Sequence, residues 1–237
     1  MCSVDLDNVK TLDELFAIWM ESQEYKNAVE ALKKKTNAPI YFVKDGIVEK
    51  YGEEKKVLYI LRDAHVTDVN NPDQDLRAAF RQSCKGEGKT WNNVGRWTLA
   101  LLDGVDAYET IRMDADILRT QLCRVAVMNL KKASGGSKAM CIEEFVQSQA
   151  KFIFTEIRLI DPDIIVTCEG ELLREIFKKA KPSQEISASE DYPDAFFRYT
   201  VQLNDREVNV VNLYHPQAGR NNGIMFRYIC DMRTLLK

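Results

Sequence analysis

The sequence predicts a three-layer α/β/α sandwich around a central, mostly parallel four-stranded sheet. Four short apolar runs rich in β-branched residues, typical of strands buried on both faces, occupy residues 57–61, 125–128, 164–166 and 208–213. Patterns with helical periodicity lie between these runs. Strands that alternate with helices favour a parallel sheet covered on both faces. We find no internal repeat or linker, so we predict one domain over residues 1–237.

The first 54 residues form an N-terminal extension to which the patterns assign no role. Residues 11–35 predict one amphipathic helix, which begins with the capping-box pair Thr11 and Glu14. Residues 41–48 predict a short hairpin with an Asp-Gly turn.

Further helices and one loop complete the predicted domain. The stretch 182–195, rich in Ser, Glu, Asp and Pro, predicts an exposed loop, and an antiparallel strand pair turns at Asn204 and Asp205. The helical patterns cover residues near 93–102, 114–122, 141–160, 171–180 and 221–236.

Composition narrows the class of protein. The chain is 45% hydrophobic and 29% charged, as in ordinary globular proteins. Its apolar runs are shorter than the about 18 residues of a membrane span, and its first residues do not resemble a signal peptide. We therefore expect a cytoplasmic monomer with no membrane partner. The six cysteines form no C-x-x-C pair, so we expect no disulfide framework, no metal and no cofactor.

Reactive side chains follow all four predicted strands. Parallel α/β sheets bind ligands beyond the carboxyl ends of their strands, so these segments are the candidates for a site. An acid, an amide, two lysines and a histidine would meet there. The four segments are Arg62-Asp63-Ala64-His65, Asn129-Leu130-Lys131-Lys132, Cys168-Glu169-Gly170 and Tyr214-His215-Pro216-Gln217.

These strand ends, in this order, resemble the uracil-DNA glycosylase superfamily. The segment Leu61-Arg62-Asp63-Ala64-His65 corresponds to a Gly-x-Asp/Asn/Glu-Pro motif. Residues 125–129 correspond to an apolar strand that ends in Asn, and Leu213-Tyr214-His215-Pro216-Gln217 to a final strand that ends in a His-Pro-Ser-type loop. Residues 91–96 resemble an aromatic-x-x-Gly-Arg stretch of several branches, with one residue more between Trp91 and Gly95. The resemblance covers about residues 55–236 and implies the superfamily's parallel sheet between helices.

The resemblance also implies a role for each matching residue. Hydrolysis of an N-glycosidic bond develops positive charge on the sugar and negative charge on the departing base. Asp63 would orient water or stabilise the sugar cation, and His215 would donate a hydrogen bond to the base oxygen. Asn129 would read the pyrimidine edge. As alternatives, Asp63 is a cap, Asn129 is a turn residue and His215 is a structural group.

Two further sets of residues extend the predicted site. Trp91 would stack on the extruded base and His65 would shape its pocket, unless Trp91 belongs to the core and His65 caps a turn. Lys131, Lys132 and Arg220 would contact phosphates beside the Gly-rich loop after Ser134, unless they lie in a solvated loop.

The leading hypothesis is a metal-free glycosylase that hydrolyses the N-glycosidic bond of uracil or a related damaged base in single-stranded or locally opened DNA. The net charge of −3 argues against tight, extended duplex binding. One alternative is a non-catalytic nucleotide- or nucleic-acid-binding module, because the first motif lacks its Gly and Pro and the last loop has no apolar wedge. Another is an enzyme that acts on a small nucleoside-like substrate.

Overall fold

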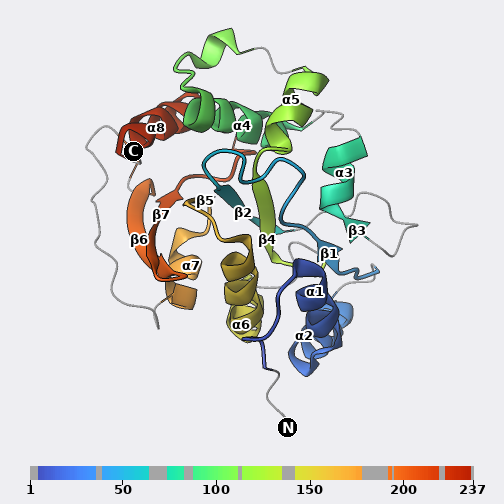
Figure 1. Cartoon of the computed structure of the whole chain (residues 1–237). Coiled ribbons are helices and arrows are strands. Elements are labelled where there is room, and N and C mark those ends of the chain that lie inside the picture. Colours follow the sequence, from blue (N-terminus) through green and yellow to red (C-terminus); the bar gives the residue numbers. More distant parts are fainter. Residues whose placement is uncertain are drawn as a thin grey trace.

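A five-stranded sheet forms the centre of the protein, with helices on both of its faces (Figure 1). The computed structural model describes residues 5–35, 39–63, 74–82, 88–111, 114–134, 142–177, 192–193, 195–218 and 222–235. Four parallel strands lie in the order β4 (Ala126–Lys131), β2 (Val57–Asp63), β5 (Ile164–Thr167) and β7 (Arg206–Asn212), and β6 (Phe197–Leu203) pairs antiparallel with β7. The predicted α/β class is confirmed, but the sheet has five strands rather than four, because both arms of the predicted antiparallel pair join it.

Two hydrophobic clusters lie on opposite faces of the sheet. Leu58 and Ile60 of β2 belong to the cluster beneath four helices, and Tyr59 belongs to the other cluster. This alternation follows the two-residue period of a strand. The first face is covered by α1 (Leu12–Glu21), α2 (Gln23–Lys35), α6 (Ile142–Ile160) and α7 (Gly170–Phe177). The second is covered by α3 (Leu76–Gln82), α4 (Lys89–Thr98), the π-helix Leu99–Asp103, the 3-10 turn Tyr108–Thr110, α5 (Ala115–Leu122) and α8 (Asn222–Leu235).

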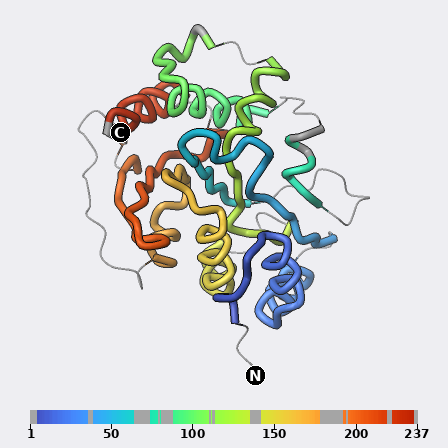
Figure 2. Tube along the Cα trace, in the orientation of Figure 1, coloured from blue at the N-terminus to red at the C-terminus, as the bar shows by residue number. Residues whose placement is uncertain are grey.

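The N-terminal residues pack against α6 as two helices, not the single helix predicted over residues 11–35 (Figure 2). The capping box of Thr11 and Glu14 is confirmed. The break occurs at Ser22, whose backbone is extended and whose hydroxyl donates to the carbonyl of Trp19 at 2.7 Å. The same hydroxyl accepts from the N–H of Tyr25 at 3.2 Å, so it ends α1 and begins α2.

The hairpin predicted for residues 41–48 is wrong. This segment instead runs along the outer edge of β4, where the N–H of Gly46 donates to the carbonyl of Val127 at 2.7 Å. Within it, β1 (Val43–Lys44) pairs in parallel with β3 (Gln74–Asp75). The segment covers an edge that would otherwise expose unpaired backbone groups. Gly46 has a φ of 111°, which only glycine adopts readily.

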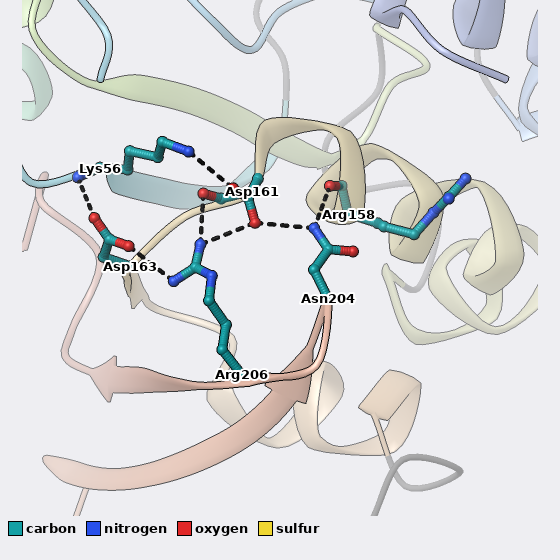
Figure 3. Close-up of polar contacts among 6 residues, drawn as sticks. All are labelled: Lys56, Arg158, Asp161, Asp163, Asn204 and Arg206. Atoms are coloured by element: carbon teal, nitrogen blue, oxygen red, sulfur yellow. Dashed lines mark hydrogen bonds and ion pairs between the residues drawn. The ribbon is translucent and has the colours of Figure 1, made fainter. Parts of the chain in front are cut away.

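A charged network joins the amino-terminal ends of three strands (Figure 3). Arg206 donates to the carboxylates of Asp161 at 2.9 Å and Asp163 at 2.8 Å. Lys56 donates to both carboxylates, through its side chain to Asp161 and its backbone N–H to Asp163, at 2.8 Å each. Burial alone would raise the pKa of Asp161, but hydrogen bonds from Lys56, Asn204 and Arg206 outweigh it and lower the pKa to about 2.

The predicted turn at Asn204 and Asp205 is confirmed. Both residues have positive φ, 47° and 61°, which suits the two-residue turns that join twisted antiparallel strands. Among the described residues, no helix is long and apolar enough to cross a membrane.

Candidate functional site

The candidate site lies at the carboxyl ends of the four parallel strands, at the edge of the sheet opposite the charged network. From β2 the chain passes to β4 on one side of β2, and from β4 it passes to β5 on the other side of β2. The direction of winding therefore reverses between β2 and β5. In open α/β sheets, ligands bind outside the strand ends at such a reversal.

Asp63 and Lys131 form an ion pair at this edge. They are direct partners in the β2–β4 register, and the Nζ of Lys131 lies 3.8 Å from the Oδ1 of Asp63. The side chain of Lys131 is 1% exposed and that of Asp63 is 15% exposed. Burial lowers the pKa of Lys131 and the nearby Arg62 adds to this, whereas the negative charge of Asp63 opposes it.

A second ion pair lies one residue earlier on β2. Arg62 contacts Glu169, which lies two residues after the end of β5, at 3.5 Å. Burial raises the pKa of Glu169, and the charges of Asp63 and Glu143 raise it further, against the opposing effect of Arg62. The sequence placed Glu169 among the strand-end residues without giving it a role. Its position two residues after a buried strand is the feature of the sequence that indicates a place at this site.

The His215 loop is fastened to α4 and α8. The buried side-chain amide of Asn93 donates to the carbonyl of Pro216 at 2.6 Å and to the Oδ1 of Asn222 at 3.0 Å. The N–H of Gln217 donates to the Nδ1 of His215 at 3.2 Å. A ring nitrogen that accepts a hydrogen bond carries no proton, so the N–H donor of this imidazole is its Nε2.

Trp91 also lies on α4, two residues before Asn93. It is half-buried, and its ring meets that of Phe80 edge-on with centroids 4.9 Å apart. Trp91 therefore contributes to the packing of α3 on α4. This contact is typical of a core residue. Because the ring is only half-buried, stacking of Trp91 on a base stays a prediction.

Asn129 and Lys132 belong to a buried polar cluster rather than to an open pocket. The side chain of Asn129 donates to the Oδ2 of Asp45 at 3.2 Å. The ammonium of Lys132 contacts Asp45 and donates to Glu156 at 2.7 Å, and all three of these side chains are fully buried. Phosphate binding by Lys132 does not fit this burial, and neither does phosphate binding by Lys131.

Two predicted site residues, His65 and Arg220, lie outside the described residues, as does the Gly-rich loop after Ser134. Within the described ranges, no group of three or more His, Cys, Asp or Glu side chains is arranged to hold a metal ion. Of the predicted set, the structure thus brings together Asp63 and Lys131 and fastens the His215 loop to the helix of Trp91.

No family model and no curated protein sequence matches this chain.

Proposed function

We propose that this protein is a DNA-base glycosylase that hydrolyses the N-glycosidic bond of uracil or a related damaged base. One observation carries the proposal: the Asp63 carboxylate ends β2 where the winding of the sheet reverses, on the face covered by the helix that holds the His215 loop. A carboxylate and a fastened histidine at the same edge of the sheet are the two groups that this reaction requires at its two developing charges.

Asp63 would act on the sugar. Its side chain is mostly buried yet retains 15% exposure, so water has access to an anion whose field is only weakly screened. This arrangement suits either the orientation of an attacking water or the stabilisation of positive charge on the sugar carbon.

His215 would act on the departing base. Because the Nδ1 accepts from Gln217, the Nε2 N–H is the donor that would bond to a base oxygen as it becomes negative. Two strand spacings separate β2 from β7, which puts about 10 Å between the ends that carry Asp63 and His215. An extruded nucleotide would lie between them, because a base within a duplex cannot reach such a pocket.

A second candidate is a binding module without hydrolysis. Asp63 already faces Lys131, and the Asn129 amide is bonded to Asp45. These contacts favour a site in which the groups stabilise the fold and hold a nucleotide without cleaving it.

Base release decides between the two candidates. Uracil-containing single- and double-stranded oligonucleotides are incubated with wild type, Asp63→Asn, His215→Ala and the control Asp116→Asn, which alters a carboxylate exposed on α5. We expect Asp63→Asn to lower kcat by about 10²–10⁴-fold with binding retained, and the control to match wild type. Binding of uracil or single-stranded DNA without release would support the module. Equal release by Asp63→Asn and wild type would refute the role of Asp63.

A further inference from the structure

We infer that Lys131 is a positioning residue, which holds the Asp63 carboxylate in place and supplies the positive charge opposite it. This inference rests on the proposed function, because positioning matters only if Asp63 acts on a substrate. It replaces the expected role of Lys131 in phosphate binding.

The sheet itself brings the two groups together. Asp63 and Lys131 are register partners on neighbouring parallel strands, so their side chains emerge on the same face of the sheet. The Nζ–Oδ1 distance of 3.8 Å is longer than a direct hydrogen bond, so Lys131 acts on the carboxylate mainly through its charge.

Burial distinguishes this role from phosphate binding. With 1% of its side chain exposed, Lys131 does not offer its ammonium to the backbone of a nucleic acid. Its neighbour Lys132 points to the opposite face, where Asp45 and Glu156 hold it in the core. Lys132 thereby anchors the end of β4 and fixes the backbone from which Lys131 reaches Asp63.

The pair makes activity sensitive to alkaline pH. In the described part of the chain, the charged groups that act on Lys131 are Asp63 and Arg62, both on β2. Burial and Arg62 lower the pKa of Lys131, so its positive charge is present at low pH and is lost below the range of an ordinary lysine. Asp63 then loses its partner, and activity falls as pH rises. Arginine keeps its charge throughout this range.

One measurement tests the pairing without any substrate. In full-length protein with ¹³C-labelled lysine, the Lys131 resonance is identified by its loss in Lys131→Arg and is titrated by NMR. Because the charge of Asp63 helps Lys131 keep its proton, we expect Asp63→Asn to move this titration to lower pH. The control Lys151→Met alters an exposed lysine on α6 and should change nothing. An unchanged Lys131 titration in Asp63→Asn would overturn the inference.

A second measurement follows base release across pH. We expect Lys131→Met to lower kcat by about 10²-fold with little change in KM, and Lys131→Arg to recover much of it and move the alkaline limb upward. Unchanged kcat with a raised, salt-dependent KM would mean phosphate contact and would overturn the inference. Absence of release in wild type would refute the proposed function alone, and the NMR titration would still decide whether the two groups are coupled.

Discussion

Replacing Lys132 with methionine removes the positive charge that lies between the carboxyl groups of Asp45 and Glu156. All three side chains are fully buried, and the ammonium also lies 5.6 Å and 5.8 Å from the ring centroids of Phe16 and Trp19. Methionine keeps most of the aliphatic stem, so the packing changes little and the loss is mainly that of the charge.

The expected cost is about 3–5 kcal/mol, because the substitution leaves a buried carboxylate without its cation. Glu156→Gln should behave differently. Burial raises the pKa of Glu156 well above its ordinary value of 4.5, and Asp45 contributes to this, against the opposing charge of Lys132. The raised pKa favours the protonated form of Glu156, and glutamine resembles this form closely enough that we expect a cost below about 1 kcal/mol.

The same raised pKa gives the stability a pH dependence of known sign. Between 4.5 and its raised value, Glu156 binds a proton in the folded state that it releases on unfolding. The stability that it contributes is complete below 4.5 and is lost as pH rises toward the folded pKa. Glu156→Gln has no proton to lose, so its stability relative to wild type should increase between about pH 5 and about pH 8.

Urea unfolding followed by circular dichroism at both pH values measures these differences, with Lys151→Met as the exposed-lysine control. If Lys132→Met does not fold alone, the double variant Asp45→Asn/Lys132→Met leaves no unpaired charge and should recover stability. A loss of less than about 1 kcal/mol in Lys132→Met would refute the reasoning, as would an equal loss in Glu156→Gln.

Two further predictions concern stability elsewhere. Asp161→Asn removes the charge of Asp161, while asparagine also tolerates the φ of 53° at this position. Because the pKa of Asp161 is lowered to about 2 and its side chain is 32% exposed, we expect the free energy of unfolding to fall by about 1–2 kcal/mol at neutral pH. Thermal unfolding should show that this loss disappears as pH falls from about 4 to about 2. A constant difference across that range would contradict this explanation. Gly170→Ala would put a Cβ 2.7 Å from the Oδ1 of Asn212, so urea unfolding should show a loss of about 1–3 kcal/mol, whereas Gly223→Ala, with nothing within 4 Å, should show no loss. Equal stability of the two variants would refute the steric argument.

The elements that could be predicted are those whose apolar residues recur with the period of a buried strand or helix face. The strand expected at 164–166 is observed as β5 (Ile164–Thr167), which is buried on both faces. The helix expected at 141–160 is observed as α6 (Ile142–Ile160), which is buried on one face. The single helix over residues 11–35 was wrong because a serine hydroxyl competed with the helical backbone. The hairpin was wrong because its Asp-Gly pair serves the edge of β4 rather than a turn.

The position of the candidate site in the fold could be predicted from the sequence better than the residues that belong to it. Topology alone put the strand ends at one edge, and this placed Asp63, His215 and Glu169 correctly as strand-end residues. Which of them have partners depends on segments distant in sequence. Asn129, for example, is bonded to Asp45, 84 residues away, and no local pattern reports such a contact.

The roles assigned to Lys131 and Lys132 depend on the residue at which β4 ends. The apolar run ends at residue 128, so both lysines looked like members of one polar loop after it. Pairing with β2 carries β4 on to Lys131, and the alternation of a strand then sends the two lysines to opposite faces. One face places Lys131 next to Asp63 at the candidate site, and the other places Lys132 next to Asp45 and Glu156 in the core. The two adjacent lysines therefore have different surroundings, because β4 extends three residues beyond the apolar run that predicted it.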